Sequence, residues 1–503
     1  MIEHIMITIY PEILLSIALF AAIILSTTKQ KDLIWIISSL LMLTGIFHLL
    51  KNFSFEPNLI FNGMFVVDGL SNIFRLLTLI TALLILLGSV KYTEGFVNKS
   101  EFLIIFLSAV IGIMFLIGAN DLITLFVSLE TLGLSSIMLA GYSKYDPRSN
   151  EAALKYLLNT ASASAIFLFG LSLIYGLTGS TQFDEIQAKL LDLVQVGGLN
   201  QNILIITLIL LIGGLAFKLA CAPFHMWSPD VYEGAPTPVT AFLSTASKAA
   251  GFVITLRLLV DVFGFAIETW KPILVIIAVL SMIVGNFIAL GEVLNKTSVK
   301  RFMAYSSIAQ VGYILSGIAL GTNETISASV FYLIIYTIMN LGAFLCIIAF
   351  GNEANSDMIS DYSGLAKKKP LLAFGFAVCL FNLSGLPIPP AGFIAKFVLF
   401  KSIFEAGTVG IILAVIGLVT TVLSVFYYSY VAKIMIVDEP SNAVLNIDSN
   451  VNALGKSKKL NLAIISAVAA VFILSVISNP ILKASNIASN QFTKTSTLVS
   501  LKK

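Results

Sequence analysis

The chain has 503 residues, of which 58% are apolar and only 11% are charged. A soluble chain of this length carries roughly a quarter charged residues, so this composition, with a mean hydropathy of +0.97, excludes a set of ordinary soluble domains. The formal net charge of +3 says less than the distribution of the charged residues along the chain.

Apolar runs of membrane-spanning length recur from end to end, and fourteen of them predict transmembrane helices. Each must be helical, because hydrocarbon offers the backbone groups no water partner. In chain order they are 9–27, 33–50, 72–90, 102–119, 121–142, 152–176, 202–231, 237–262, 272–290, 299–320, 325–351, 370–403, 407–433 and 460–478. The whole chain, 1–503, is therefore expected to form one all-α, polytopic membrane domain. The polar segment 438–459 is expected to be a solvated loop, and no long helix is expected after 460–478.

Lysine and arginine gather at alternate ends of these segments. If the N-terminus lies outside, the inner loops and helix ends hold most of the basic residues, among them Lys91, Lys367, Lys458 and Lys459. The outer loops hold few. The positive-inside rule then predicts that both termini lie on the outer, periplasmic or lumenal, side of the membrane.

Five basic residues remain inside the predicted spans: Arg75, Lys218, Lys248, Arg257 and Lys396. An ionisable group at the bilayer centre costs about 2.5–3.5 kcal/mol on the mildest scale, so its default interpretation is functional. Arg75 lies near the start of its span, which favours snorkelling to the surface. For Arg257, five residues from a span end, snorkelling or a structural ion pair is as good an explanation as function.

Glu130 lies nine residues into the segment that begins at Asp121, which places it about 13 Å deep. Lys248 is about 16 Å deep by the same measure, and Lys218 lies near the middle of 202–231. A buried Glu–Lys pair that serves packing alone is the structural alternative. The depth of three such groups in one chain favours function.

Two predicted helices should be interrupted beside a lysine. Pro223 follows Lys218, and the proline-rich stretch 387–390 precedes Lys396. Proline removes a backbone donor and clashes with the preceding turn. Such breaks are tolerated at membrane depth only where protein or water meets the freed backbone. We therefore expect helices seven and twelve to be broken.

The spans also fall into two blocks of five, 102–262 and 272–433. Five is an odd number, so the second block must be inserted upside-down relative to the first. Each block contains one interrupted helix with its lysine. Interrupted segments at corresponding places in inverted repeats are typical of an ion pathway near the midplane. The segment 460–478 then follows as the last transmembrane helix.

Four stretches resemble one family of membrane proteins. The most specific is 217–243, which reads FKLACAPFHMWSPDVYEGAPTPVTAFL; the others are 127–132, 150–156 and 300–308. The chain resembles subunit N of bacterial NADH-quinone oxidoreductase (complex I), the counterpart of subunit 2 of the mitochondrial and chloroplast enzymes. The segment 146–151 resembles the cyanobacterial and plastid branch.

The resemblance implies which residues matter. It assigns a proton pathway to Glu130, Lys218, Lys248 and Lys396, with supporting positions at Glu151, Lys155, His225 and Gln310. The spacing of Glu151 and Lys155 also makes an ordinary i,i+4 helix pair. At position 310, glutamine stands where related antiporter-like subunits often have a titratable histidine. Glutamine can hold a water chain by hydrogen bonding but cannot carry the proton itself.

The resemblance also implies a function. An antiporter-like membrane-arm subunit translocates protons, driven by quinone reduction in neighbouring subunits. The chain is then part of a translocase without a redox centre of its own. NADH, FMN, iron–sulfur clusters and quinone belong to the rest of the complex, because this sequence has no dinucleotide fingerprint and no cluster ligands. Its three cysteines stand alone in apolar stretches, which also argues against a metal site.

The implied partners are other membrane subunits and the bilayer, not nucleic acid. The implied location is the bacterial cell inner membrane or the thylakoid. A subunit of a multi-subunit cation/proton antiporter is the alternative function, since it shares the Glu–Lys arrangement. The long signature at 230–239 favours the complex I subunit. A purely structural scaffold would leave the buried charges without a role.

Overall fold

The computed structural model describes residues 2–28, 31–198, 200–447 and 454–500. In chain order its helices are α1 (Ile2–Thr8), α2 (Tyr10–Ser26), α3 (Lys31–Lys51), α4 (Gly69–Tyr92), η1 (Thr93–Gly95), α5 (Lys99–Ile117), α6 (Leu122–Ala140), α7 (Pro147–Thr178), α8 (Phe183–Gln195), α9 (Gln201–Leu219), α10 (Trp227–Gly234), α11 (Thr237–Phe242), η2 (Leu243–Ser247), α12 (Lys248–Leu256), η3 (Arg257–Val262), η4 (Gly264–Ala266), α13 (Ile267–Leu294), α14 (Val299–Leu320), α15 (Asn323–Ala354), η5 (Ile359–Tyr362), α16 (Leu365–Lys368), α17 (Pro370–Ser384), α18 (Ala391–Glu405), α19 (Thr408–Ile436), α20 (Asn442–Leu445), α21 (Lys458–Val476) and α22 (Ser478–Ser500). Two short strands, β1 (Asn58–Ile60) and β2 (Phe65–Val67), pair antiparallel.

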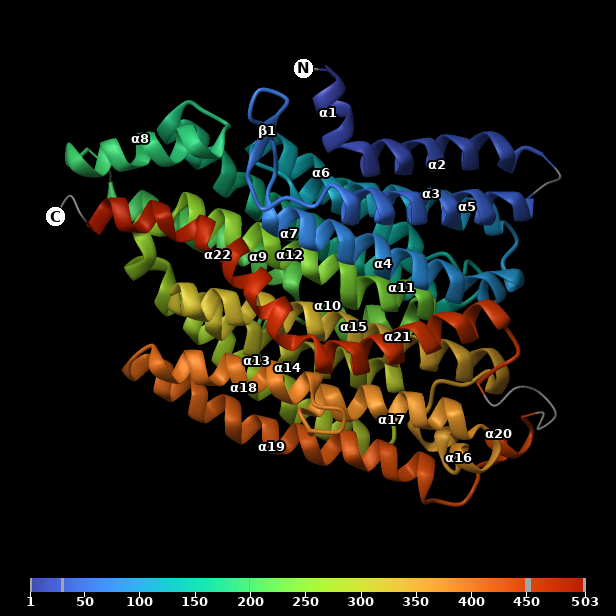
Figure 1. The fold of residues 1–503 in the computed structure, drawn as a ribbon. Helices are drawn as coiled ribbons and strands as arrows, with labels where there is room; N and C mark the ends of the chain where they lie inside the picture. Colours follow the sequence, from blue (N-terminus) through green and yellow to red (C-terminus); the bar gives the residue numbers. More distant parts are fainter. Residues whose placement is uncertain (1, 29–30, 199, 448–453, 501–503) are drawn as a thin grey trace.

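Figure 1 shows the long helices lying side by side in one bundle, with α16 and α20 at one end and α8 at the other. Among the described residues, 12 helices are long and apolar enough to cross a membrane. Two shorter apolar helices, α2 and α17, add to them. The all-α, multi-pass membrane class predicted from the sequence is confirmed. Each of the fourteen predicted segments overlaps one helix or a run of consecutive helical elements, but the count of fourteen spans stays a prediction.

Both predicted interruptions are present. Helix α9 ends at Leu219 and α10 begins only at Trp227. Helix α17 ends at Ser384, and α18 begins at Ala391 after the proline-rich stretch. The first pair lies within predicted span 202–231 and the second within 370–403. Loss of the proline N–H groups ends both helices where the sequence placed the breaks.

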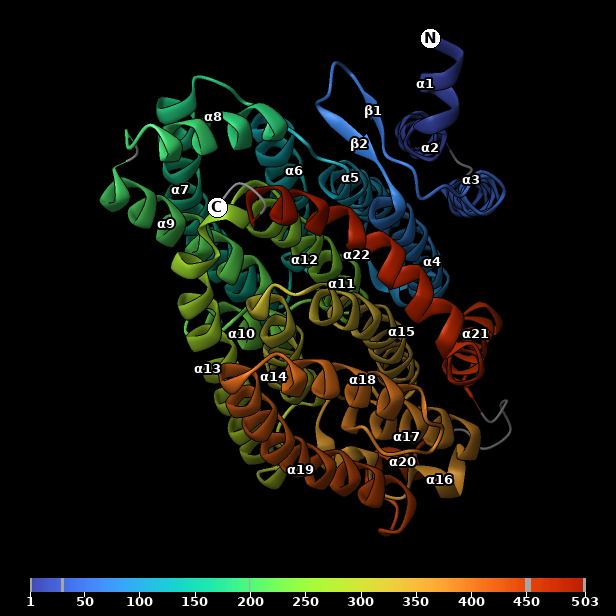
Figure 2. The same cartoon turned by 60° about the vertical axis from the view of Figure 1, so that its left-hand side comes forward.

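Three spans are enclosed by the rest of the bundle. In the run α11–η2–α12–η3 and in helix α15, all residues of the most apolar 18-residue stretch are buried, and in α14 94% of that stretch is buried. By contrast, only 28% of the corresponding stretch of α7 is buried. Figure 2 shows α15 and α12 inside a ring formed by α4, α13, α18 and α22. A polar group on an enclosed span must meet protein or water rather than lipid.

The N-terminal helices are joined by a buried ion pair that corrects one expectation. Arg75 on α4 does not snorkel: it is 0% exposed. Its guanidinium donates two hydrogen bonds to the carboxylate of Glu12 on α2, at 2.7 and 2.5 Å. The same guanidinium also donates to Thr8 and Asn72. Glu12 supplies the counter-charge that makes burial of Arg75 tolerable.

Arg257 also lies in a buried ion pair, one of the two structural alternatives left open by its position. Its Nη2 is 3.0 Å from Asp68, which caps the start of α4. Its Nε donates to the carbonyl of Ile117 at the end of α5. The pair ties the π-helical η3 to two other helices. Arg257 is therefore satisfied by protein groups rather than by the membrane surface.

The hairpin β1–β2, helix α8 and helix α22 are among the elements that were not predicted from the sequence. The hairpin β1–β2 turns through Asn62 and Gly63, both with positive φ. Helix α8 is a separate amphipathic helix after α7. The expectation of no long helix after 460–478 is wrong, because α22 extends over 23 residues. Figure 2 shows α22 running diagonally across α15, α4 and α12. Helix α22 is too polar to be recognised as a membrane span, so the hydropathy of the sequence did not predict it.

The segment 438–459, predicted as a solvated loop, is only partly described. It contains the single-turn helix α20, whose Val444 is buried, and the first residues of α21. Residues 448–453 of this predicted loop lie outside the described residues. The first part of the segment is thus packed against the protein rather than fully solvated.

Candidate functional site

The interruption after Lys218 is held open by protein groups. Ala220 adopts a left-handed conformation that closes α9, and the amide of Cys221 donates to the carbonyl of Ala216 at 2.8 Å. The carbonyl of Phe217 accepts a hydrogen bond from the indole of Trp227 at 3.1 Å. Backbone groups freed by the break are therefore satisfied inside the protein. Lys218 lies in the last turn of α9, one residue before the helix ends.

Glu130 on α6 and Lys218 on α9 lie on either side of α7. The hydroxyl of Ser164 on α7 donates to Glu130 Oε1 at 2.5 Å. Among the described residues, no ion pair within 4.0 Å joins Glu130 to Lys218. Both side chains are half-buried. Glu130 is held by Ser164 on the helix that lies between them.

A small cavity of about 20 Å³ is lined by Lys218, Ser164 and Trp227. One water molecule needs about 10–15 Å³, so this cavity has room for a single water. The cavity therefore separates the serine that holds Glu130 from the side chain of Lys218 by no more than the space of one water.

Gly251 brings Lys218 close to the helix that carries Lys248. A Cβ at this glycine would lie 3.4 Å from Lys218 Cγ and 3.0 Å from a methyl group of Leu219. The absence of a side chain therefore allows α12 to approach α9. Lys248 begins α12, where the π-helical η2 ends. A π-helical turn re-aims the side chains that follow it and is frequent at functional sites.

Lys248 is 2% exposed. Its ammonium donates to the hydroxyl of Ser307 on α14 at 2.8 Å and lies 6.0 Å from the ring centre of Tyr232. Nearby, Tyr336 and Asn340 of α15 both donate to the carbonyl of Ser244, one turn before Lys248. The ammonium of Lys248 thus meets neutral groups, the Ser307 hydroxyl on α14 and the Tyr232 ring on α10.

Gln310 lies one turn further along α14 and is fully buried. Its amide nitrogen donates to the carbonyl of Leu383 at 2.9 Å, and its oxygen accepts from the hydroxyl of Tyr332. The same nitrogen is 3.4 Å from the hydroxyl of Tyr428, which also bonds Ser306. Gln310 therefore joins α14, α15 and α19 to the end of α17, where the second break begins.

Lys396 occupies the far side of that break. Its ammonium donates to the carbonyl of Ser384, the last residue of α17, at 3.0 Å. It also lies 4.9 Å from the ring centre of Tyr313. The stem of Lys396 packs against Gly385, where an added Cβ would come within 2.9 Å. Glycine here allows the close approach and also the positive φ of +89°.

These contacts place Lys248, Gln310 and Lys396 in one buried polar row. Ser307 follows Ser306 in α14, and the carbonyls of Leu383 and Ser384 are adjacent in the chain. The polar groups that contact Lys248, Gln310 and Lys396 thus come from neighbouring residues of the chain. Among the described residues, no ion pair within 4.0 Å joins Lys218, Lys248 or Lys396 to a carboxylate.

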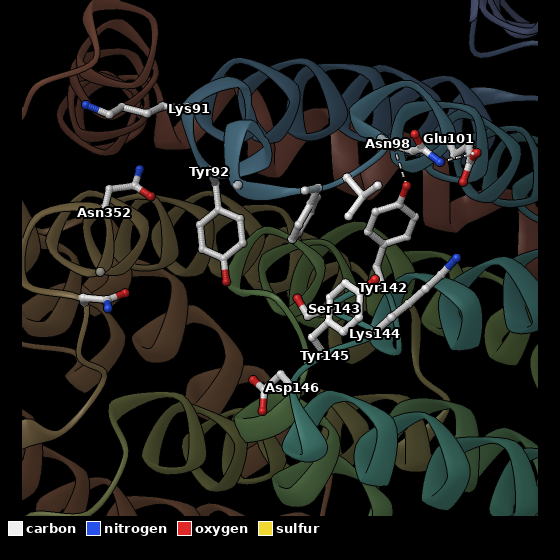
Figure 3. A pocket seen from close by; sticks show the side chains of 15 residues that line it. Lys91, Tyr92, Asn98, Glu101, Tyr142, Ser143, Lys144, Tyr145, Asp146 and Asn352 are labelled. Atoms are coloured by element: carbon white, nitrogen blue, oxygen red, sulfur yellow. Dashed lines mark hydrogen bonds between the residues drawn. The ribbon is translucent and has the colours of Figure 1, made fainter.

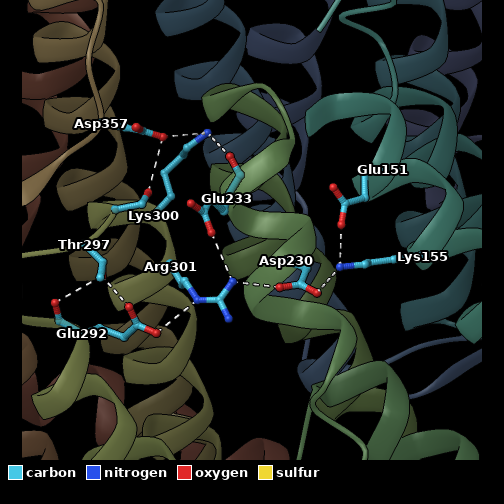
Figure 4. A network of polar contacts seen from close by, with 10 residues as sticks. Glu151, Lys155, Asp230, Glu233, Glu292, Thr297, Lys300, Arg301 and Asp357 are labelled. Carbon is cyan, nitrogen blue, oxygen red and sulfur yellow. Dashed lines mark hydrogen bonds and ion pairs between the residues drawn. The ribbon is translucent and has the colours of Figure 1, made fainter. Parts of the chain in front are cut away.

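Glu151 and Lys155 do not join this row. They form the i,i+4 pair at 2.7 Å, and Lys155 also binds Asp230 at 2.7 Å. Figure 4 shows Asp230 between Lys155 and Arg301, which lies 2.8 Å from it. One carboxylate on α10 thus connects α7 with α14 at the end of the bundle.

The same network continues along α14. Arg301 also binds Glu233 and Glu292, both at 3.1 Å. Lys300 donates to the carbonyl of Glu233 and lies 3.4 Å from Asp357. Figure 4 shows these charges gathered where α10 meets α14. The network fixes the short half-helix that follows the first break.

His225 lies in the first break but away from the lysines. Its ring centre is 6.3 Å from that of Tyr305. The side chain is mostly buried, and its Nδ1 has no hydrogen-bond partner among the described residues. The contact that the structure shows for His225 is thus with Tyr305 on α14, and none of the hydrogen bonds described above joins it to a lysine.

A polar cavity of about 620 Å³ lies at the end of the bundle where the chain leaves α4 and α6, and residues after both helices line it. Figure 3 shows Tyr92, Tyr142, Ser143 and Asp146 around it, with Tyr142 donating to the carbonyl of Asn98. Tyr92 also meets Thr237, the first residue of α11. Helix α11 leads through η2 directly to Lys248, so this cavity adjoins the element that carries the central lysine.

Sequence reasoning missed the neutral members of the row. Ser164, Ser307, Tyr313, Tyr332 and Tyr428 hold the charged candidates or link them, yet serine and tyrosine are unremarkable in transmembrane helices. A usable signal exists in α14 and α15, where serines, tyrosines and amides recur within otherwise apolar runs. Among the described residues, no group of three or more His, Cys, Asp or Glu side chains is arranged to hold a metal ion.

A family of known proteins matches most of this chain. The profile of the family described as NADH:quinone oxidoreductase/Mrp antiporter, transmembrane, matches residues 119–424, which include both breaks and all four proposed pathway residues. The chain belongs to this family. The conclusion agrees with the resemblance carried by the four sequence stretches and accounts for the two broken helices in one chain.

Relatives within the family are close. NAD(P)H-quinone oxidoreductase subunit 2 of Microcystis aeruginosa is 47% identical over 426 residues, covering 84% of this chain and 81% of the relative. The subunit of the same name from Synechocystis is 45% identical over 451 residues, covering 88% and 84%. The chain therefore belongs to the subunit 2 branch of the family, as the segment 146–151 suggested.

Solved structures agree on the fold. A chain of respiratory complex I from Thermus thermophilus with bound aureothin is 30% identical, with a TM-score of 0.77 over 95% of this chain and 99% of that one. A chain of the Mrp complex from Dietzia has a TM-score of 0.83 over 98% and 99%. At 21% identity the latter likeness concerns the fold alone.

Proposed function

We propose that this chain is an antiporter-like membrane-arm subunit that translocates protons, coupled to quinone reduction elsewhere in a NAD(P)H:quinone oxidoreductase. The observation that carries the proposal is the enclosed row from Lys248 through Gln310 to Lys396. Its lysines meet hydroxyls and carbonyls instead of carboxylates. The name of the subunit 2 relatives supplies the redox reaction.

The chemistry of such a row follows from its low dielectric. Burial disfavours the charged form of lysine, and neutral partners compensate the ammonium only in part. Each lysine can therefore exist with or without its proton. Interacting sites titrate together, so charge that arrives near one site favours release of the proton from the next. Protons are passed along the plane of the membrane, and the ionisable residues that carry them follow the order Glu130, Lys218, Lys248 and Lys396.

We assign the two interrupted helices to two inverted repeats, 102–262 and 272–433, with 460–478 as the closing span. Both breaks supply backbone carbonyls beside a lysine. Trp227 and Ser281 satisfy other backbone groups at the first break. An open backbone next to an ionisable group gives water a path that a continuous helix would seal.

We assign proton uptake to the cavity of Figure 3. It lies at the end of the bundle that carries the basic loops, which the positive-inside rule makes the inner side. Tyr92 and Thr237 connect the cavity to α11 and hence to Lys248. Both termini then face the periplasm or lumen. The membrane is the bacterial cell inner membrane or the thylakoid.

The proposal includes the rest of the complex. Other membrane subunits pack beside this chain, and NADH, FMN, iron–sulfur clusters and quinone are held by other subunits. Glu151, Lys155, His225 and Gln310 support the pathway from their places around the first break and along α14. Gln310 does so as a hydrogen-bond relay without a charge of its own.

The test uses the assembled complex in membrane vesicles, with proton uptake followed during quinone reduction. Glu130→Gln and Lys218→Ala should each lower uptake strongly while the chain stays inserted and the complex stays assembled. Glu405→Gln, at an exposed carboxylate on α18, serves as the matched control and should pump normally. Normal uptake in both pathway variants would show that the Glu130–Lys218 region is only structural.

A cation/proton antiporter subunit is the second candidate, supported by the shared fold of the Dietzia Mrp chain. The two functions differ in what drives the proton. Vesicles given a sodium or potassium gradient without any electron donor separate them. Proton movement that needs the cation gradient, and that ignores quinone reduction, would favour the antiporter.

A further inference from the structure

A second cavity, of about 560 Å³, lies away from the polar row, where α3, α4, α5 and α21 meet. We call it the basic cavity. Five lysines line it: Lys91, Lys99, Lys456, Lys458 and Lys459. Only two carboxylates, Asp32 and Glu94, share the lining, and Lys99 already pairs with Asp32. The cavity therefore has an excess of positive charge.

Trp35 gives the basic cavity a second feature. This side chain lines the cavity and is 4% exposed. Its indole Nε1 has no hydrogen-bond partner among the described residues. Indole nitrogen only donates, and a buried donor without an acceptor is costly. An acceptor that comes from outside the chain would satisfy it.

The wall of the basic cavity continues as an apolar face. Ile36 lines the cavity itself. Leu33, Leu40, Leu43 and Phe47 are also exposed, and their spacing of three and four residues places them on one side of α3. The lining of the basic cavity thus combines lysines with the side chain of Trp35, and the exposed hydrocarbon face of α3 adjoins it.

We propose that the basic cavity binds the headgroup of an anionic phospholipid. The phosphate lies among the lysines and accepts a hydrogen bond from Trp35, and the acyl chains lie along the exposed face of α3. Basic pockets between transmembrane helices are suited to such headgroups. A bound lipid would fasten the start of α21 to the ends of α3 and α4.

Inorganic phosphate shares the charge but not the apolar part of this ligand. It would leave Leu40, Leu43 and Phe47 unused. The positive-inside rule explains why lysines collect at this end of the chain, but it requires neither a cavity nor an unpartnered indole. The combination of charge, donor and apolar face is what selects a lipid.

The experiment uses the full-length chain, purified in an uncharged detergent and stripped of lipid. Dioctanoyl phosphatidylglycerol, dioctanoyl phosphatidylcholine and inorganic phosphate are titrated separately. Binding is measured by native mass spectrometry and by the shift of the thermal midpoint. We compare Lys458→Gln with Lys459→Gln as a pair, and Trp35→Phe alone. The matched control is the neighbouring pair Lys367→Gln with Lys368→Gln, on α16 outside the cavity.

Phosphatidylglycerol should bind saturably and raise the thermal midpoint, while phosphatidylcholine should not. The Lys458 and Lys459 double variant should bind at least tenfold more weakly, and Trp35→Phe several-fold more weakly. The control pair should bind like the unaltered chain. Because Lys458 and Lys459 are exposed, the double variant tests the site even where Trp35→Phe fails to fold.

Three outcomes would overturn the proposal. Equal binding of phosphatidylcholine would remove the role of charge. Equal weakening in the control pair would show a general surface effect. Protection by inorganic phosphate with the same dependence on Lys458 and Lys459, and no further effect of phosphatidylglycerol, would make the cavity a site for a free anion instead.

Discussion

Lys248 donates a hydrogen bond to the hydroxyl of Ser307 across 2.8 Å, and this contact joins α12 to α14 at the enclosed centre of the bundle. The same hydroxyl donates a hydrogen bond to the carbonyl of Ala304, at 2.7 Å. The hydroxyl proton is therefore directed away from the ammonium, and the oxygen accepts from it. A serine in this position holds the ammonium in place without neutralising it.

Replacing Ser307 with alanine tests that contact. Hydrogen bonds to charged groups contribute about 1.5–3 kcal/mol, so loss of this acceptor should lower the rate of proton uptake roughly tenfold. Uptake is measured in vesicles carrying the assembled complex. Ser329→Ala is the control, because Ser329 is equally buried but donates only to the carbonyls of Ile314 and Thr325. Equal rates in the two variants would contradict a role for Ser307.

Gln310 offers a test of transport and stability together. Gln310→Leu leaves the Leu383 carbonyl and the Tyr332 hydroxyl without their partner, and each unsatisfied group costs about 1–3 kcal/mol. The thermal midpoint of the purified chain and the rate of proton uptake should both fall. Gln310→His restores one donor and one acceptor and should keep most of the uptake. Normal uptake in the leucine variant would exclude Gln310 from the pathway.

The buried pair of Glu12 and Arg75 should matter for stability alone. Removing one partner of a buried pair costs about 3–5 kcal/mol because the other charge stays behind. Glu12→Leu should therefore lower the thermal midpoint sharply, and Glu12→Leu with Arg75→Met should recover much of the loss. Lys401→Ala, which breaks an exposed pair at 3.9 Å, should change stability by under about 1 kcal/mol.

The outcome for Arg75 shows which features sequence reasoning captures. Its ion-pair partner, Glu12, lies 63 residues away in the chain. Because no local pattern links the two residues, the position of Arg75 near the start of its span favoured snorkelling instead of an ion pair. The breaks beside Lys218 and Lys396 were predictable because proline acts on its own helix. The half-buried position of Glu130 was not predictable, because it depends on how α7 packs beside α6.

The hairpin and α22 illustrate two further limits. Strands of three residues give no alternation to detect, although the sequence Asn62-Gly63 is a recognised turn signal. Helix α22 lacks an apolar stretch long enough for a membrane span, and no helix was therefore predicted there. Contacts between distant elements, such as Gln310 with Leu383, come from tertiary packing that no local pattern encodes.

Lys396 provides the sharpest functional prediction. A proton carrier must release its proton as well as hold it, and the low dielectric around a buried lysine favours the neutral form. The ammonium of Lys396 meets a carbonyl oxygen and an aromatic ring, and among the described residues no carboxylate pairs with it. Lys396→Arg keeps a positive charge at the same place.

Guanidinium does not release its proton at physiological pH, so Lys396→Arg should abolish proton uptake in vesicles if Lys396 is a carrier. Assembly of the complex is checked separately, since the stem at position 396 packs against Gly385. Lys401→Arg, on the exposed side of the same helix, should take up protons normally and controls for the substitution itself. If Lys396 only stabilises the broken backbone, arginine can donate to the Ser384 carbonyl as well as lysine does, and uptake would match the unaltered chain. That result would remove Lys396 from the pathway and leave Glu130, Lys218 and Lys248 as its remaining charged members.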